Sequence, residues 1–75
     1  MTIGELLEKY KTIGRDNVSV VIITKDFDMG DYITIYDGTV EKLLTHANTT
    51  EIRIRKFLYW WVHVSVGEYK ICIAI

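Results

Sequence analysis

One run of nine residues does most to limit the folds open to this chain. The segment NVSVVIITK, residues 17–25, is rich in β-branched side chains, and its positions from Val20 to Ile23 are apolar without interruption. β-branched residues favour strands, and a strand that is apolar on both faces is typical of the centre of a sheet. We therefore expect this segment to be a central strand that is covered on both faces.

The segment that follows supplies a partner for this strand. YITIY, residues 32–36, alternates cleanly, and DFDMGD, residues 26–31, connects the two runs, so the pair predicts a β-hairpin. DFDMGD also resembles a calcium loop in part. Counted from Asp26, however, Gly30 falls one position too early, and Asp37 stands where an EF-hand loop has its bidentate glutamate. We expect a solvated turn and no metal.

Two other segments carry helix signals. Thr2 and Glu5 form a T-x-x-E capping box, and Gly14 is a natural stop for the helix that it opens. Thr39 is expected to cap a second, short helix, which the NTT at residues 48–50 closes. Both segments repeat apolar residues at i, i+3, i+4 and i+7, which indicates one buried face. These residues are Ile3, Leu6, Leu7 and Tyr10, and then Val40, Leu43, Leu44 and Ala47.

The sequence pattern of the last third of the chain predicts strands. The pattern turns extended from Glu51, and VHVSV-GE-YKICIAI is typical of a two-residue hairpin with Gly67 at the first central position of a type II′ turn. The order is then α-β-β-α-β-β(-β) in a single domain over residues 1–75. This is an α+β fold, a small and mostly antiparallel sheet of four to five strands with two short helices on one face.

The chain is short for a self-sufficient fold. The core of a 75-residue chain rarely supplies more than about 3–5 kcal/mol of net stability. Such domains often need an additional source of stability, a staple such as a disulfide, a metal or a partner subunit. Cys72 is the only cysteine, which excludes an internal disulfide, and we expect it to be a small buried hydrophobe. Cys72, His46 and His63 stand at spacings unrelated to zinc sites. We expect no cofactor, and a homodimer is the expected staple.

The aromatic segment RKFLYWWVHV, residues 55–64, is the clearest candidate for function. In an unbroken strand, alternate side chains share a face, so an apolar set that includes Trp60 would face the core. The opposite face would be almost wholly arginine and aromatic, and Tyr32 and Tyr36 would extend it on a neighbouring strand. The candidate binding residues are Arg53, Arg55, Phe57, Tyr59, Trp61, His63, Tyr32 and Tyr36.

Length limits this interpretation. Residues 51–66 would span about 50 Å if fully extended, whereas a compact chain of this size has a radius of gyration of about 11 Å. A bulge or turn must therefore interrupt the run, and one inserted residue reverses every later side chain. Which of Trp60 and Trp61 faces outward is left open by the sequence.

Four uses of the arginine and aromatic face remain open at this point. It could be buried between two subunits, dock another protein through residue types that dominate binding energy, or stack the bases of single-stranded nucleic acid. In the fourth, the second helix covers it as core. A sequence pI of about 6.0 argues against nucleic acid, because dedicated nucleic-acid binders are usually basic.

Other classes of function have less support. Ser65 and His63 lie two residues apart with no carboxylate to orient the imidazole, so we expect no enzyme. No apolar run is long enough for a membrane span, and the N-terminus lacks the pattern of a signal peptide, so we expect a cytoplasmic protein without membrane contact.

The order and sequence pattern of the predicted helices and strands resemble those of a known group of proteins. MTIGELLEKY, VSVVIITKD, YITIYDGTVEKLL and YKICIAI together resemble small proteins encoded by phages and prophages of Gram-positive bacteria. Some small phage proteins of this size inhibit host defence complexes, including CRISPR effectors. The resemblance implies a non-enzymatic inhibitor that binds a host protein complex in the host cytoplasm. Single-stranded nucleic-acid binding and a purely structural homodimer are the alternatives.

Overall fold

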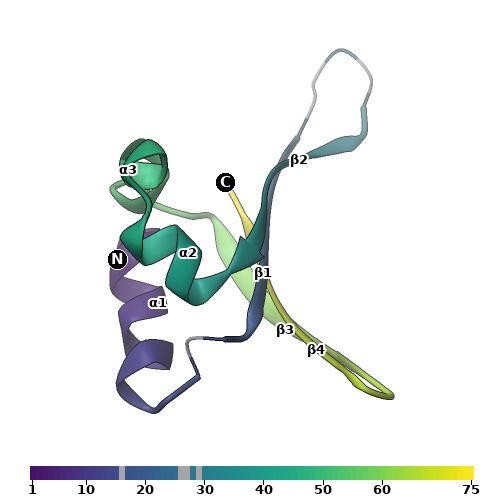
Figure 1. Cartoon of the computed structure of the whole chain (residues 1–75). Coiled ribbons are helices and arrows are strands. Elements are labelled where there is room, and N and C mark those ends of the chain that lie inside the picture. The colour runs from purple at the N-terminus through teal and green to yellow at the C-terminus, as the bar shows by residue number, and fades with distance from the viewer. Residues whose placement is uncertain (16, 26–27, 29) are drawn as a thin grey trace.

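The computed structural model describes residues 1–15, 17–25, 28 and 30–75. In this part of the chain one four-stranded sheet carries its helices on one side, and the other side has no helix (Figure 1). The elements are α1 (Ile3–Thr12), β1 (Ser19–Lys25), β2 (Tyr32–Thr39), α2 (Val40–Thr45), the 3₁₀ turn η1 (Ala47–Thr49), α3 (Thr50–Arg53), β3 (Tyr59–Ser65) and β4 (Glu68–Ala74). The expected α+β class is confirmed, with four strands.

The sheet has the strand order β2-β1-β4-β3. β1 and β4 are parallel at its centre, and each pairs antiparallel with its hairpin partner, β2 or β3, at an edge. The sheet is therefore mostly antiparallel, and NVSVVIITK supplies a central strand, both as predicted. Only one face of that strand is fully covered. Val20 and Ile22 are buried beneath the helices, whereas Val21 and Ile23 on the other face are half-buried.

The core lies between the helices and the sheet. Thr2 and Glu5 form the predicted capping box through two reciprocal hydrogen bonds of 3.2 and 3.0 Å, and Thr39 caps α2 through its hydroxyl. The main buried side chains are Ile3, Leu6 and Leu7 of α1, Val40, Leu43 and Leu44 of α2, Val20 and Ile22 of β1, and Ile71 and Ile73 of β4. No helix in the described ranges has the length and apolar character to cross a bilayer.

The expected strand from Glu51 is wrong. Residues 47–53 continue as η1 and α3, and β3 begins only at Tyr59. The Thr49 hydroxyl donates to the carbonyl oxygens of Leu43 and His46, and the Arg53 guanidinium reaches back to the end of α2. These bonds satisfy carbonyls that α2 leaves open, so they hold the segment in a helical turn. Residues 51–66 were too long for one uninterrupted strand, and this helical turn is the interruption.

The connection between β3 and β4 differs from the expectation in detail. Ser65 pairs with Glu68, which leaves Val66 and Gly67 as the turn, and Gly67 is the second central residue. Its φ is +74°, and no described non-glycine residue has a positive φ, so the turn resembles type II rather than type II′. In the other connection, DFDMGD, three positions lie outside the described residues: Asp26, Phe27 and Met29.

Candidate binding face of the sheet

The register of the sheet determines which side chains lie on the face without helices, which we call the open face. Directly paired residues share a face, so each row across the sheet can be followed from edge to edge. One row runs Thr34, Ile23, Ala74, Tyr59, the next Asp37, Val21, Cys72, Trp61, and a third Thr39, Ser19, Lys70, His63. Tyr32, opposite Lys25, continues the open face on β2. The first two rows are mostly apolar, and the third is polar.

Three aromatic side chains dominate the apolar part of this face, and we call them the aromatic strip: Tyr32, Tyr59 and Trp61. The Tyr59 and Trp61 rings stack with centroids 5.6 Å apart and an interplanar angle of 25°. The hydroxyl oxygens of Tyr32 and Tyr59 are 3.4 Å apart. Because their strands are the two edges of the sheet, both side chains must extend inward across β1 and β4 to meet.

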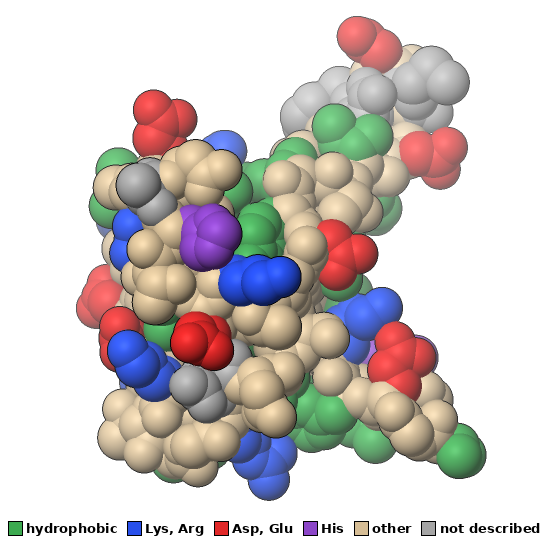
Figure 2. All heavy atoms as spheres, viewed as in Figure 1, with side chains coloured by type: hydrophobic (Ala, Val, Ile, Leu, Met, Phe, Trp, Pro, Cys, Tyr) green, Lys and Arg blue, Asp and Glu red, His purple; other side chains and the backbone are tan. Residues whose placement is uncertain are grey.

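The strip is exposed even though its members contact each other. Tyr32 is 54% exposed, Tyr59 49% and Trp61 40%. Ala74, on the same face beneath the two tyrosines, is 2% exposed, so the rings shield the floor of the sheet there. Figure 2 shows hydrophobic side chains reaching the surface along both hairpins, at the upper and lower right of the view. The aromatic surface is thus held in place but left uncovered.

The polar end of the open face is already paired within the chain. Lys70 forms an ion pair of 3.1 Å with Glu68, which also accepts a hydrogen bond from the Ser65 hydroxyl at 3.4 Å. The hydrogen bond between the two charged groups lowers the pKa of the Glu68 carboxyl and raises that of the Lys70 ammonium. His63 lies directly opposite Lys70 on β3. These groups form a charge-balanced rim beside the aromatic strip.

Cys72 lies on the floor of the open face, directly opposite Trp61. It is a free thiol and half-buried, which differs from the full burial expected of it. Burial raises the pKa of the Cys72 thiol, so the unreactive protonated form is favoured at neutral pH. The residue is therefore a chemical reporter of this face.

Four of the eight predicted site residues share the open face: Tyr32, Tyr59, Trp61 and His63. Tyr59, Trp61 and His63 share this face as predicted because β3 is regular from Tyr59 to Ser65, and Tyr32 joins them from β2. The floor residues Val21, Ile23 and Cys72 were not singled out from the sequence. Alternation within VVIITK and YKICIAI is the signal that could have identified them.

The other four lie elsewhere, which corrects the predicted single face. Arg53 and Arg55 belong to the helical turn and the segment after it, and the Arg55 carbonyl accepts a hydrogen bond from the Ile3 backbone at the start of α1. Phe57 precedes β3 and packs against the core. Tyr36 pairs with Ile22, which places it on the helix side of the sheet. The helical turn removed the arginines from the strand, and the register of β2 turned Tyr36 inward.

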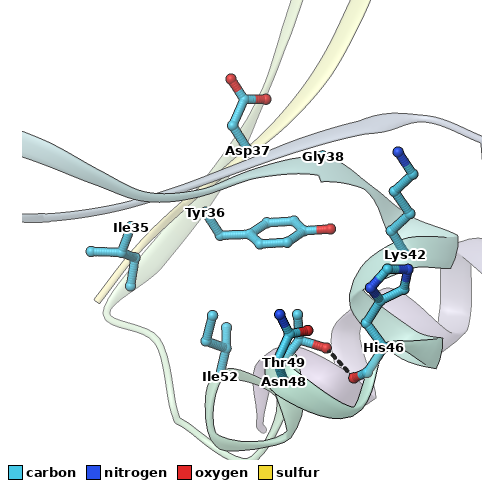
Figure 3. A pocket seen from close by; sticks show the side chains of 9 residues that line it. All are labelled: Ile35, Tyr36, Asp37, Gly38, Lys42, His46, Asn48, Thr49 and Ile52. Carbon is cyan, nitrogen blue, oxygen red and sulfur yellow. Dashed lines mark hydrogen bonds between the residues drawn. The ribbon is translucent and has the colours of Figure 1, made fainter.

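Tyr36 instead lines a pocket between β2 and the end of α2 (Figure 3). The pocket has a volume of about 320 Å³, near the lower limit for a small-molecule site. The Tyr36 hydroxyl donates to the carbonyl oxygen of Thr39 at 3.2 Å, and burial raises the pKa of this phenol. Lys42 and His46 bring polar groups to the rim, while Asp37 points away from the pocket (Figure 3).

The described residues of the open face do not assemble a nucleophile with an oriented base. Among the described residues no group of three or more His, Cys, Asp or Glu side chains could hold a metal ion. Ser65 and His63 share the face, but the Ser65 hydroxyl donates to Glu68. Comparison with family models, curated proteins and solved structures gives no match for this chain. Its own geometry is therefore the basis for a functional proposal.

Proposed function

We propose that this protein is a non-enzymatic binding module that docks another protein on the open face of its sheet. The observation that carries the proposal is the aromatic strip, in which Tyr59 contacts both Tyr32 and Trp61 and all three side chains stay between 40% and 54% exposed. Tyrosine and tryptophan offer large apolar areas at a low cost in conformational entropy, and they are the types most enriched among energetically dominant interface residues.

The contacts within the strip favour tight binding. The Tyr59 ring is stacked on Trp61, and its hydroxyl forms a hydrogen bond with the Tyr32 hydroxyl. The three side chains therefore lose little conformational entropy when a partner covers them. Lys70 and Glu68 at the edge satisfy each other and form a polar rim. A preorganised aromatic centre with a polar rim is the usual anatomy of a protein interface.

A protein partner fits this surface better than nucleic acid does. Stacked bases need cations nearby to hold their phosphates. On the open face, Lys70 is already paired with Glu68, and Asp37 adds a negative charge, while Arg53 and Arg55 belong to the helical side of the molecule. Charge does not accumulate here in the way that phosphate binding requires.

The sequence resemblance suggests which partner to test first. Some small phage proteins of this size inhibit host defence complexes, so we propose a host protein complex, such as a CRISPR effector, as the partner class. Inhibition would follow from occupation of a functional surface on that complex. No chemistry from this chain is needed for such a role.

The test is a comparison of binding by matched variants. Tyr32→Ala and Trp61→Ala each remove one side of the strip. As the control, Ile54→Ala removes an apolar side chain that is 68% exposed in the helical region. A partner captured by the wild type and reconstituted in pure form should lose at least tenfold in affinity for the first two variants, as hot-spot truncations do, and bind Ile54→Ala normally.

Two outcomes would contradict the proposal. Equal affinity of the wild type and both strip variants would show that the partner binds elsewhere. Salt-sensitive binding of a single-stranded oligonucleotide, with quenching of Trp61 fluorescence, would assign the face to nucleic acid instead. Tyr32 lies on the edge strand opposite β3, so its variant reports on the open face and not on the β3 edge.

A further inference from the structure

The two edge strands of the sheet differ in how well they resist pairing with another strand. β2 contains Gly38 and a charged residue, Asp37, and its register with β1 shifts between Ile22 and Ile23. Charges and bulges are usual protections of a sheet edge, and glycine weakens a strand. β3 has none of these: its register with β4 is continuous over seven residues, YWWVHVS, without lysine, acid, proline or glycine.

Apolar side chains on β3 and directly beside it are also exposed. Leu58 is 77% exposed, Val64 67%, Val66 105% and Trp60 40%. Trp60 packs edge-to-face on Tyr10 of α1, with ring centroids 6.2 Å apart. A long, apolar edge left unpaired favours association, so something is expected to cover it.

We propose that this occupant is a second copy of the chain, paired β3 to β3 in antiparallel fashion about a two-fold axis at Val62. The axis is perpendicular to the sheet, so each face of one copy continues as the same face of the other. Directly opposite residues must lie on the same face, whereas neighbouring residues in one strand lie on opposite faces. A two-fold axis between two residues would pair neighbours with each other, so the axis must pass through a residue. Centring on Val62 is the register that uses the whole of β3.

This register matches the exposed side chains with each other. On the helix side it places Leu58 opposite Val66 of the second copy and Trp60 opposite Val64, while Val62 meets its own equivalent. On the open face, Trp61 is opposite His63, and Tyr59 is opposite Ser65. No pair joins like charges, and aromatic residues opposite β-branched ones are favourable cross-strand pairs.

A groove beside Trp60 extends this contact. It has a volume of about 450 Å³ and is lined by Met1, Leu6, Lys9, Tyr10, Ile13 and Trp60. In the proposed pairing, the hairpin tip of the second copy carries Val64 and Val66 past Trp60 and toward this groove. The two most exposed valines of the chain thereby gain an apolar neighbour, which adds hydrophobic stabilisation to the backbone pairing.

The dimer would be one continuous eight-stranded sheet with both open faces on the same side. Two aromatic strips would then lie side by side across the axis, and a partner would meet a two-fold symmetric surface. The inference rests on the β3 edge alone and holds whether or not the open face binds a protein. It also supplies the staple that a chain of 75 residues is expected to need.

Charge exchange at Val62 tests both the dimer and its register. We expect the wild type to have about twice the 8.7 kDa chain mass by light scattering at about 0.1 mM, a hundredfold above a micromolar Kd. Val62→Lys and Val62→Glu each place like charges opposite one another and should give monomers. An equimolar mixture should return to the dimer mass, because lysine then faces glutamate. Thr34→Lys on the β2 edge is the control and should stay dimeric.

The mixture also controls for folding, since two misfolded variants would not restore a dimer. A monomeric wild type at this concentration overturns the proposal. A dimer that survives both single variants shows that the copies meet elsewhere and overturns it as well, and so does a mixture that stays monomeric. The proposed function fails separately, through Tyr32→Ala, which should lose the partner while the dimer remains.

Discussion

The hydroxyl oxygens of Tyr32 and Tyr59 lie 3.4 Å apart, although their strands form opposite edges of a four-stranded sheet. The two side chains span β1 and β4 and close over Ala74, and Tyr59 in turn stacks on Trp61. An aromatic surface that is joined in this way is both exposed and ordered. This combination distinguishes the open face from an incidental scatter of surface aromatics.

The first prediction concerns the titration of Tyr59. Its hydrogen bond with Tyr32 raises the pKa of the Tyr59 phenol above the ordinary value of 10.0, because the neutral form is favoured in the folded protein. Stability from this bond is therefore present below pH 10 and lost as the pH rises through the folded pKa. Tyr32→Phe should lower the pKa of Tyr59, as followed by NMR of its ring signals. An unchanged titration would show that the bond is absent in solution.

Gly38 provides a second prediction, on packing beneath the sheet. A Cβ atom at this position would lie 2.6 Å from the Tyr36 hydroxyl oxygen and 2.9 Å from the ring carbon that bears it. Gly38→Ala should therefore destabilise the fold by about 1–3 kcal/mol, as overpacking does. Urea denaturation measures this loss. The penalty should largely vanish in a Tyr36→Ala background, and an equal penalty in both backgrounds would place the strain elsewhere.

Arg53 is predicted to stabilise the fold and not to bind a ligand. Its guanidinium donates to the carbonyls of Leu44 and His46 and to the Thr50 hydroxyl, which ties α3 to the end of α2. Arg53→Ala should cost about 1.5–3 kcal/mol, the range for hydrogen bonds to charged groups. Arg55→Ala, an exposed neighbour of the same charge, should stay within about 0.5 kcal/mol. Chemical denaturation gives the free energy of unfolding of both variants. Equal losses of stability in the two would contradict this role of Arg53.

The parts of the fold that were predictable from the sequence are those encoded by local patterns. The capping box at Thr2 and Glu5, the apolar strand at 17–25 and the Thr39 cap are local patterns, so they were predictable from neighbouring residues alone. The helical turn at 50–53 was not, because Ile52-Arg53-Ile54 alternates like a strand. Its conformation depends on contacts of Thr49 and Arg53 with carbonyls of α2, which no local pattern encodes.

The candidate site was predictable in part for the same reason. Alternation places Tyr59, Trp61 and His63 on one face wherever the strand begins, so their shared face was predicted correctly even though the strand start was wrong. Tyr36 was misplaced because the register of β1 and β2 shifts between Ile22 and Ile23. The meeting of Tyr32 with Tyr59 depends on the strand order, and that order follows from the pairing of β1 with β4.

Cys72 yields a prediction on the reactivity of the open face. Burial raises the pKa of its thiol, so less thiolate is present at a given pH than in an unfolded chain. Alkylation by iodoacetamide at pH 8 should be slower in the folded protein than in urea, and Trp61→Ala should accelerate it by uncovering the neighbouring floor. Mass spectrometry follows the reaction. Equal rates for the folded wild type and Trp61→Ala would show that Trp61 does not shield the thiol.

The most direct measurement of the central claim is an NMR cross-saturation map of the protein bound to its purified partner. The account predicts that saturation transfers to the open face: to Tyr32 on β2, to Val21 on β1, to Cys72 on β4, and to Tyr59 and Trp61 on β3. Residues of α1 and α2 should be unaffected. Transfer centred on the helices, or on the pocket beside Tyr36, with the aromatic strip left silent, would contradict the assignment of the open face as the binding surface.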